Sequence, residues 1–317
     1  MLKVKIARKA LEAQDIVSLE LRSLDGANLP PFEPGAHVDL HVAPGLVRQY
    51  SLCGSPDQMA SYRIAVLREP ASRGGSAAVH ELLKEGDVVT MGVPANLFPL
   101  TASPYTFLFA GGIGITPILS MANHLWLNGA GFEFHYSARS AARMAFLGEI
   151  TQGPYAHRLH THVDDGPPAQ KLDVRQVLEA APDGSHLYVC GPQGYITHVT
   201  GAARALQWDE HLIHVEHFGN AAAAHAGGDR PFCIRIASTG QTVSVGSQES
   251  ATAALVREGI LVPVACEQGI CGTCLTRVIA GVPEHRDMYL TDAEKAANNQ
   301  FLPCCSRSAG DILVVDL

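Results

Sequence analysis

The sequence has no run of basic residues, no uninterrupted apolar segment near its start and no second Cys-x2-Cys pair. Without a basic run, and with a formal net charge of −8 over 317 residues, the chain is not expected to bind nucleic acid. Charges are scattered through residues 1–21, which argues against a signal peptide. We expect a soluble, cytoplasmic protein whose eight cysteines are thiols rather than a disulfide framework.

Asp, Glu, Lys and Arg are also absent from residues 100–132, a stretch long enough to cross a membrane. The same stretch contains a Gly-Gly-Ile-Gly turn, a proline and an Asn-His pair. A buried strand, a turn and a packed helix explain this pattern better than a membrane span. No contact with a membrane is expected.

The pattern of apolar residues divides the chain into three segments. Residues 1–100 contain short alternating runs separated by turn residues, which predicts an antiparallel barrel or sandwich. Residues 101–220 alternate apolar strands with helical stretches, which predicts a parallel sheet covered by helices. Residues 221–230 have the small-residue composition of a linker, and residues 231–317 form a compact third segment.

Individual strands and helices follow from the same patterns. The predicted strands are 16–21, 37–42, 62–66, 88–93, 106–110, 132–136, 186–190, 213–216, 232–237, 242–245 and 312–315. The predicted helices are 76–84, 116–127, 174–181 and 251–258, and a capping-box pattern at 291–294 opens a further short helix.

Three cysteines lie within nine positions, in the run CEQGICGTC at 266–274. Gly269 and Gly272 let this loop fold back on itself, because glycine adopts positive φ without steric cost. A fourth cysteine follows after 29 intervening residues, and Cys-x4-Cys-x2-Cys…Cys is the ligand spacing of plant-type [2Fe–2S] clusters. Structural zinc more often shows two Cys-x2-Cys pairs. The predicted cluster ligands are Cys266, Cys271, Cys274 and Cys304, and Cys305 is expected to pack beside them as a thiol.

A [2Fe–2S] cluster accepts one electron at a time, so a nicotinamide donor requires a flavin that divides its two electrons. Arg48-Gln49-Tyr50-Ser51 lies in a strand-like run and offers a phosphate ligand, a stacking ring and a hydroxyl group. Residues 73–76 (RGGS) open a predicted helix, whose bare N–H groups suit a phosphate. Both patterns also have purely structural explanations, as exposed strand residues and as a glycine turn with a serine cap.

Two glycine-containing turns follow strands of the second segment. The run Gly111-Gly112-Ile113-Gly114-Ile115-Thr116-Pro117 follows one apolar strand, and Cys190-Gly191-Pro192 ends another. The first run lacks the third glycine of the standard dinucleotide fingerprint, so alone it predicts only close approach of the backbone to a ligand. Both turns are expected at the carboxyl edge of the sheet, where ligands bind in such folds.

Together these motifs resemble the ferredoxin–NADP reductase superfamily, and more closely the phthalate dioxygenase reductase and vanillate demethylase reductase family. The resemblance implies an FMN-binding antiparallel β-barrel at 1–100, a Rossmann-like NAD-binding α/β domain at 101–220, a linker at 221–230 and a β-grasp plant-type ferredoxin domain at 231–317. The matching elements occur in the family's order: RQYSL (48–52), RGGS (73–76), GGIGITP (111–117), CGP (190–192), EHF (216–218) and CEQGICGTC…C (266–304).

The resemblance also implies roles for single residues. FMN is favoured over FAD because RGGS resembles the FMN-binding members. NADH is favoured over NADPH by overall similarity, although Arg139 and Arg143 would suit a 2′-phosphate. The implied FMN contacts are Arg48, Gln49, Tyr50, Ser51, Gly74, Gly75 and Ser76. The implied NAD contacts are Gly111, Gly112, Gly114, Thr116, Pro117, Arg139, Cys190, Gly191 and Pro192. The implied catalytic residues are Ser51, Cys190 and Phe218, the last an aromatic beside the flavin.

The implied function is electron transfer from NADH through FMN and the cluster to a separate terminal oxygenase. This oxygenase is expected to be a Rieske non-haem iron enzyme acting on an aromatic or similar small molecule, and the chain is expected to be monomeric by itself. Two alternatives stay open: a self-contained NAD(P)H-dependent flavin and iron–sulfur reductase, and a redox sensor or carrier without turnover. An exposed one-electron outlet is useful mainly for a protein acceptor, which argues against the self-contained reductase.

Overall fold

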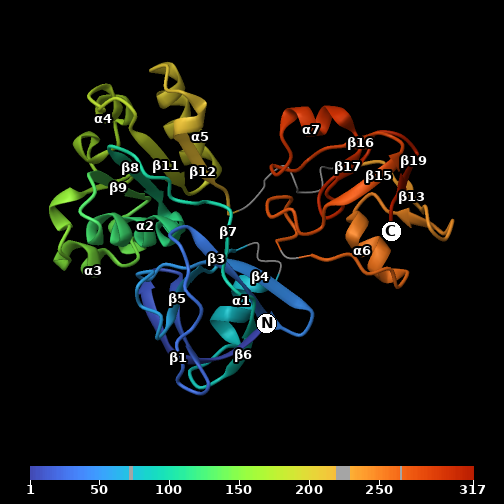
Figure 1. Cartoon of the computed structure of the whole chain (residues 1–317), viewed down its shortest axis with the longest axis horizontal. Coiled ribbons are helices and arrows are strands. Elements are labelled where there is room, and N and C mark those ends of the chain that lie inside the picture. Colours follow the sequence, from blue (N-terminus) through green and yellow to red (C-terminus); the bar gives the residue numbers. More distant parts are fainter. Residues whose placement is uncertain (71–73, 219–228, 265) are drawn as a thin grey trace. The chain divides into compact units, whose positions relative to one another are not determined.

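A computed structural model describes residues 1–70, 74–218, 229–264 and 266–317. Arg73 of the predicted phosphate motif and most of the predicted linker lie outside the described residues. The chain divides into two compact units, unit 1 at 1–218 and unit 2 at 219–317, and each is described by itself (Figure 1). Within the described ranges, no helix is both long and apolar enough to span a lipid bilayer.

The first half of unit 1 is an antiparallel β-barrel. Its hydrogen-bonded path follows the order β4-β3-β6-β1-β2-β5, and β7 pairs with β3. A bridge between Leu52 and Ile64 links the end of β4 to β5 and so joins the two ends of this path. The strands are β1 (Leu2–Ala13), β2 (Ile16–Ser23), β3 (Ala36–Ala43), β4 (Leu46–Ser51), β5 (Tyr62–Leu67), β6 (Val88–Met91) and β7 (Ala95–Asn96).

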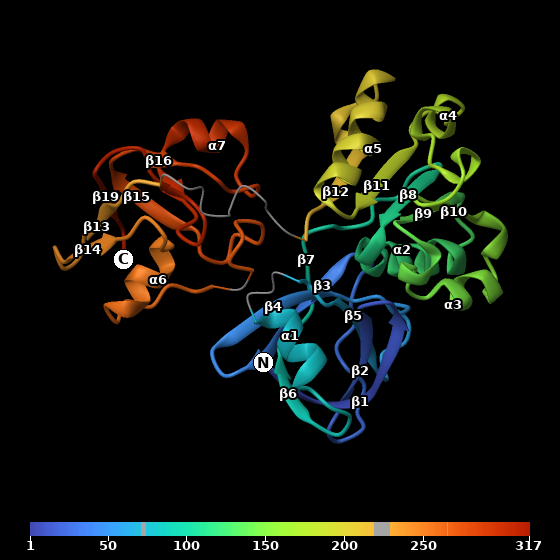
Figure 2. The same ribbon diagram turned by 180° about the vertical axis from the view of Figure 1, so that it is seen from behind.

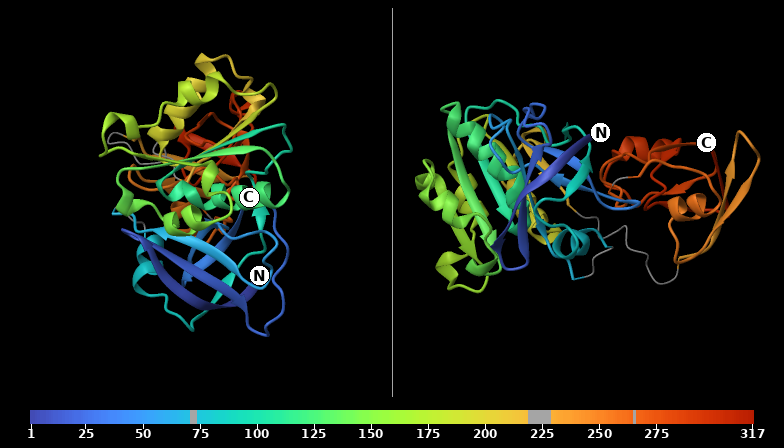
Figure 3. Two further views of the ribbon diagram at one scale, coloured as in Figure 1. Left: turned by 90° about the vertical axis from the view of Figure 1, so that its left-hand side faces the viewer. Right: turned by 90° about the horizontal axis from the view of Figure 1, so that it is seen from below.

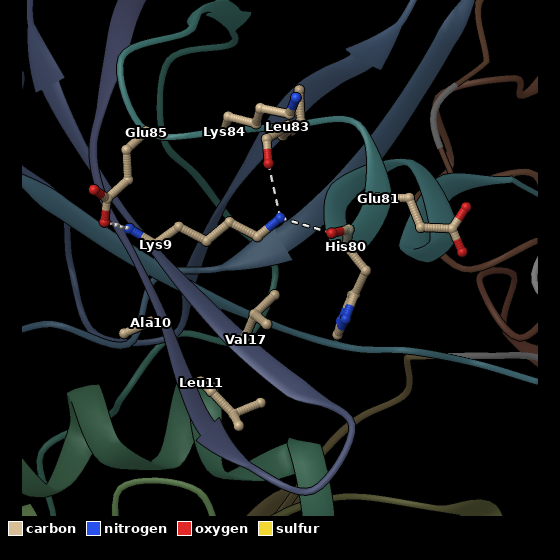
Figure 4. Close-up of a pocket in the computed structure, with 9 residues that line it drawn as sticks. All are labelled: Lys9, Ala10, Leu11, Val17, His80, Glu81, Leu83, Lys84 and Glu85. Carbon is tan, nitrogen blue, oxygen red and sulfur yellow. Dashed lines mark hydrogen bonds between the residues drawn. The ribbon is translucent and has the colours of Figure 1, made fainter.

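The helix of the barrel, α1 (Gly75–Glu81), ends three residues earlier than the sequence pattern predicts. The Lys9 ammonium group donates hydrogen bonds to the carbonyl oxygens of Val79, His80 and Leu83, at 2.8, 2.8 and 2.7 Å. Figure 4 shows the bonds to His80 and Leu83. These bonds satisfy carbonyl groups that a helix leaves unpaired at its C-terminal end. A residue of β1 therefore supports the C-terminal end of α1, beside a cavity of about 460 Å³.

The second half of unit 1 is a five-stranded parallel sheet in the order β10-β9-β8-β11-β12. The strand order reverses between β8 and β11, which is the position of the ligand crevice in doubly wound folds. One strand, β10 (LHTHV), is not among the predicted strands because its His and Thr side chains break the apolar pattern. The strands are β8 (Thr106–Gly111), β9 (Phe132–Ala138), β10 (Leu159–Val163), β11 (His186–Cys190) and β12 (Ile213–Glu216).

Helices cover both faces of this sheet. On one face lie α2 (Ile115–Leu127) and α3 (Leu147–Gln152), and on the other lie α4 (Val174–Glu179) and α5 (Gln193–Ala205) (Figures 1 and 2). The hydrophobic core under α2 also contains Ile16, Cys53 and Phe98, which come from the barrel half. This cluster therefore joins the barrel to the parallel sheet, while the barrel interior and the face under α4 and α5 have clusters of their own.

Unit 2 is a mixed five-stranded sheet in the order β14-β13-β19-β15-β17, with β16 and β18 as a separate pair. Only β13 and β19 run parallel among its described strand pairs. Figure 3 shows α6 beside the β13–β14 hairpin, in shades of orange. This arrangement is the expected β-grasp fold. The elements are β13 (Phe232–Ile236), β14 (Thr242–Val245), α6 (Ala251–Arg257), β15 (Thr276–Ala280), β16 (Pro283–Glu284), α7 (Asp292–Ala297), β17 (Gln300–Phe301), β18 (Arg307–Ser308) and β19 (Ile312–Val315).

Candidate functional site

The two glycine-containing turns of the parallel sheet lie against each other. Cys190 at the end of β11 is opposite Ala110 on β8. A methyl group added to Gly114 would lie 2.2 Å from the Cys190 carbonyl oxygen, and one added to Gly191 would lie 2.9 Å from the Gly111 Cα atom. Only glycine permits this approach, so the turns form one continuous backbone surface at the point where the strand order reverses.

The residues around these turns divide into packed and open positions. The Thr116 hydroxyl donates to the carbonyl oxygen of Ile113 at 3.1 Å, and the residue is buried. Pro117 lies in the first turn of α2, where its missing N–H needs no partner. Gly112 has a φ of 54° and no other atom within 4 Å of an added methyl group, so its face of the turn is open to a ligand. Pro192 directly precedes α5.

Three polar side chains meet where the barrel joins the sheet. Ser51 ends β4, Cys190 ends β11 and Glu216 ends β12. The Ser51 hydroxyl donates to Glu216 Oε2 at 3.4 Å, and the Cys190 thiol contacts the same oxygen at 3.9 Å. Glu216 is not among the site residues expected from the sequence. In the sequence, the only indication that Glu216 belongs to the site is its position in the EHF motif, at the end of a strand.

Desolvation controls the protonation of this group of side chains. It raises the pKa of Glu216 to about 8, and the hydrogen bonds from Ser51 and Cys190 offset only part of the effect. Desolvation also raises the pKa of the Cys190 thiol well above its usual value. At neutral pH Glu216 therefore holds a proton and Cys190 is a thiol. The site is uncharged while it keeps a proton available on the Glu216 carboxyl group.

The two predicted flavin segments, residues 48–51 and 74–76, lie side by side on the barrel. A methyl group added to Gly75 would lie 2.6 Å from Arg48 Cγ, so the Arg48 side chain crosses the start of α1. Ser76 Oγ accepts a hydrogen bond from the backbone N–H of Glu69 at 3.1 Å. Gly74 directly precedes α1 with a φ of 87°. A cationic side chain and the N-terminal end of α1 therefore occupy one surface.

Other predicted site residues differ in their surroundings. Tyr50 is half-buried, and burial raises the pKa of its phenol group. Gln49 is opposite Asp39 in the barrel sheet. Arg139 is exposed just beyond the carboxyl end of β9.

Two further residues bear on nucleotide choice and on the flavin face. Arg143 forms an ion pair with Asp15 at 3.1 Å, so its guanidinium group already has an anionic partner. Phe218, two residues beyond β12, is 37% exposed, so its ring is accessible from solvent.

The four predicted cluster ligands lie in two pairs within unit 2. The thiols of Cys266 and Cys271 interact with each other, and so do those of Cys274 and Cys304. Cys304 also interacts with the thiol of Cys305. In the part of unit 2 that the structure describes, no three ligating side chains converge on one ion position. Four cysteines at these positions are the ligand set that a [2Fe–2S] cluster would take.

Cys305 packs against the cysteine loop. A methyl group added to Gly269 would lie 2.4 Å from Cys305 Sγ, so this thiol fills the space above the glycine. Its sulfur contacts the carbonyl oxygen of Leu302 at 3.7 Å, and the side chain is buried. Gly269 and Gly272 have φ values of 71° and 72°, in the left-handed region that the loop requires.

Comparison with known proteins gives consistent relatives across the whole chain. Residues 234–309 match the profile of the 2Fe-2S iron-sulfur cluster binding domain. Vanillate O-demethylase oxidoreductase of Pseudomonas sp. strain HR199 is 50% identical over 100% of both chains. Phthalate dioxygenase reductase of Burkholderia cepacia is 38% identical over 100% of this chain and 97% of its own length.

Solved structures extend the comparison to the fold. A structure of phthalate dioxygenase reductase, described as modular for electron transfer from pyridine nucleotides to [2Fe-2S], aligns with a TM-score of 0.83 and 37% identity. The alignment covers 100% of this chain and 98% of that one. The chain thus belongs to the family of oxygenase reductases that includes vanillate O-demethylase oxidoreductase and phthalate dioxygenase reductase.

Proposed function

We propose that this chain is the reductase component of an oxygenase system and passes electrons from NADH through FMN and a [2Fe–2S] cluster to a terminal oxygenase. The observation that carries the proposal is the meeting of Ser51, Cys190 and Glu216 at the barrel–sheet junction. This group joins the surface with the proposed flavin contacts to the edge that suits a dinucleotide. The paired cysteines of unit 2 supply a one-electron site in the same chain.

The residues present fit the three redox groups. Bound FMN supplies the conversion of a two-electron donor into single electrons. Arg48 and the start of α1 at residues 74–76 would hold its phosphate, with Gln49, Tyr50 and Ser51 toward the ring. The cluster would be held by the two thiol pairs, Cys266 with Cys271 and Cys274 with Cys304.

The nucleotide edge has its own set of contacts. Gly112 gives the dinucleotide access to bare backbone, and Gly111, Gly114 and Gly191 keep the turns close enough to form one surface. The pairing of Arg143 with Asp15 supports NADH over NADPH, because that arginine already neutralises a carboxylate. The set is completed by Thr116, Pro117, Arg139, Cys190 and Pro192.

The chemistry of the junction follows from its protonation. Glu216 holds a proton near neutral pH and accepts hydrogen bonds from Ser51 and Cys190. An uncharged carboxyl group does not oppose the negative charge that a hydride brings to this region, whereas a carboxylate would. Ser51 offers a hydroxyl to the flavin side and Phe218 offers an exposed ring, and both orient the reacting partners rather than exchange electrons.

The oxygenase is proposed to be of the Rieske type and to act on a methoxylated aromatic acid such as vanillate. Three relatives named vanillate O-demethylase oxidoreductase are 50, 48 and 43% identical to this chain. A reductase subunit of tert-butanol monooxygenase is 40% identical, so related chains serve other oxygenases as well. A cytoplasmic location is also proposed, because NADH and free thiols belong to that compartment. The chain is further proposed to be a monomer by itself.

Anaerobic NADH addition tests the proposal. The purified protein should lose its flavin and iron–sulfur absorbance rapidly, and the flavin released by denaturation should be FMN. Addition of the oxygenase component of a vanillate O-demethylase, with vanillate and oxygen, should then give NADH-dependent demethylation. Rapid bleaching without any transfer to an oxygenase would favour a self-contained reductase, and no bleaching would favour a sensor or carrier.

A further inference from the structure

An ion pair joins the barrel to the parallel-sheet half of unit 1. Arg63 Nη1 and Nη2, on β5, donate to the two carboxylate oxygens of Glu149, on α3, at 2.7 and 2.9 Å. Two parallel bonds of this kind fix the orientation of the two planar groups as well as their distance. The side chains are 27% and 49% exposed, and an ion pair in such a place adds little to stability. Its main effect is therefore on the geometry of the contact.

The barrel end of this contact leads directly to Ser51. Cys53, two residues beyond Ser51, donates its N–H to the Arg63 carbonyl oxygen at 2.8 Å. In return, Arg63 Nη2 donates to the Cys53 carbonyl oxygen at 3.4 Å. Cys53 is also fully buried in the hydrophobic cluster under α2. The chain that carries the Ser51 hydroxyl is thus held by both the backbone and the side chain of Arg63.

The other end of the contact lies at an unusual backbone position. Phe146, directly before α3, has a φ of 60°, in the left-handed region that bulky side chains rarely adopt. The Arg63 guanidinium carbon lies 4.6 Å from the centre of the buried Phe146 ring. Backbone strain of this kind persists only where the surroundings hold it. Arg63 supplies part of that support, together with the core around Phe146.

The segment between β9 and α3 is held by the barrel at a second place. Gln14, in the turn between β1 and β2, donates its N–H to the Ala142 carbonyl oxygen at 2.8 Å. The segment begins where β9 ends, and β9 pairs with β8 as far as Gly111, the first glycine of the nucleotide turn. The barrel therefore holds, at two places, the segment that leaves the nucleotide edge of the sheet.

We propose that Arg63 is a positioning residue that sets the nucleotide edge against Ser51 for hydride transfer, an inference that rests on the proposed function. In this step the C–H bond of the dihydronicotinamide breaks, and its hydrogen and both bonding electrons pass to the flavin. NAD⁺ is the oxidised product and FMN is reduced. Each reactant is held by a different half of unit 1. The rate therefore depends on how these halves are joined, because small misplacements slow such reactions strongly.

The hydrophobic cluster under α2 is the alternative source of this orientation. It contains residues of both halves, among them Ile16, Cys53 and Phe98 from the barrel. Hydrophobic contact is non-directional, so it holds the halves together without selecting one angle between them. The paired hydrogen bonds of Arg63 and Glu149 do select an angle, which favours them as the orienting contact.

Stopped-flow flavin reduction by NADH in the full-length protein tests this role. Arg63→Gln and Glu149→Gln should each lower the rate at saturating NADH by about tenfold. Arg63→Lys keeps the charge without the planar fork and should be slowed to a similar extent. The double glutamine variant should be no slower than the slower single variant, because both changes remove one contact. The NADH dissociation constant and the FMN midpoint potential should stay as in wild type.

A matched control comes from another paired contact in the same unit. Arg204 donates to both carboxylate oxygens of Glu210, at 2.6 and 3.0 Å, within the parallel-sheet half alone. Arg204→Gln should therefore leave the rate of flavin reduction unchanged.

Hydrogen exchange of the full-length protein without NADH gives a readout that does not depend on catalysis. The Gln14 N–H bonds to Ala142, and the Ile150 N–H bonds to Phe146 at 3.0 Å. Both N–H groups should exchange faster in the Arg63 and Glu149 variants and at the wild-type rate in Arg204→Gln.

The possible outcomes separate the role of Arg63 from the proposed function. If Arg63→Gln does not fold, Glu149→Gln keeps the guanidinium group over Phe146 and carries the same test. An unchanged rate at full FMN occupancy overturns the role and assigns the orientation to the hydrophobic cluster. A slower rate that is explained by weaker binding of NADH or FMN also overturns it. Failure of NADH to reduce the wild-type flavin contradicts the proposed function itself.

Discussion

At the scale of single residues, the Glu216 carboxyl group decides the electrostatics of the barrel–sheet junction. It has two hydrogen-bond donors, Ser51 and Cys190, yet desolvation still raises its pKa to about 8. Two donors of this kind favour the carboxylate, but they do not replace the water that burial removes. The result is a proton held beside the proposed flavin surface at neutral pH.

Glu216→Gln is expected to remove a pH dependence that the wild type shows. In the wild type, the rate of flavin reduction at saturating NADH should fall to a lower level as pH rises through about 8, because the carboxyl group then ionises. The amide side chain of the variant cannot ionise, so its profile should be flat between about pH 7 and 9. Stopped-flow measurements across this range check the expectation, and a decline that persists in the variant would assign it to another group.

The same substitution has a consequence for stability. The pKa of Glu216 is higher in the folded state, at about 8, than its ordinary value of 4.5. Between these values the folded protein binds a proton that the unfolded chain does not, so stability falls as pH rises from 4.5 to 8. Urea unfolding of unit 1 at several pH values should show this slope in wild type and a weaker slope in Glu216→Gln.

Two adjacent cysteines are expected to differ in their effect on the cluster. Cys304 interacts with both Cys274 and Cys305, and Cys305 also fills the space above Gly269. Cys304→Ser should abolish or badly damage the cluster, and Cys305→Ser should leave it largely intact. Iron and acid-labile sulfide content distinguish the two, and loss confined to the Cys305 variant would reverse the assignment.

At the scale of elements, some boundaries match the predicted ones, and others, such as the ends of α4, α6 and β6, come one or two residues earlier than predicted. The strands at 186–190, 213–216, 242–245 and 312–315 have the predicted bounds, and α7 has the predicted capping box. Helix α1 ends three residues earlier than predicted, and there Lys9 donates to its last carbonyl groups from 70 or more positions away along the chain. Apolar periodicity carries no information about such a donor.

Lys9→Met is expected to loosen α1 and weaken FMN binding. The substitution removes three hydrogen bonds that a charged group donates. Because the site is partly exposed, their loss should lower the free energy of unfolding by about 1–3 kcal/mol. Because α1 begins at the proposed phosphate contacts, the dissociation constant of FMN should rise. Urea unfolding and flavin fluorescence measure both effects. Lys84→Met, an exposed lysine beside the same cavity, is the control, and equal behaviour of the two variants would contradict the role of Lys9.

At the scale of the whole molecule, the chain consists of two units with separate cores. Unit 1 contains the barrel and the parallel sheet, each with its own hydrophobic cluster, and a third cluster with residues of both. Unit 2 contains its own core, which includes Cys274, Cys304 and Cys305. The proposed flavin and nucleotide contacts lie in unit 1, and the proposed cluster ligands lie in unit 2. Truncation between the units can therefore separate hydride chemistry from the one-electron outlet.

A protein truncated after Phe218 is expected to fold and keep its flavin, because unit 1 has a complete core. It should retain NADH–ferricyanide activity, since ferricyanide can reach the flavin directly. It should lose most cytochrome c reduction and nearly all support of the oxygenase, because both depend on the cluster. Oxygenase turnover that survives truncation would show that the cluster is not the outlet.

The sequence by itself determined what depends on residues close together along the chain. The cysteine spacing, the glycine turns and the change from alternating strands to strand–helix repeats specified the fold class, since each is a property of a short segment. The tertiary structure decided what depends on distant residues. Ser51 and Glu216 are 165 positions apart, and Tyr289 meets Gly272 across the cysteine loop. Such contacts arise from the packing of whole elements, so no local pattern encodes them.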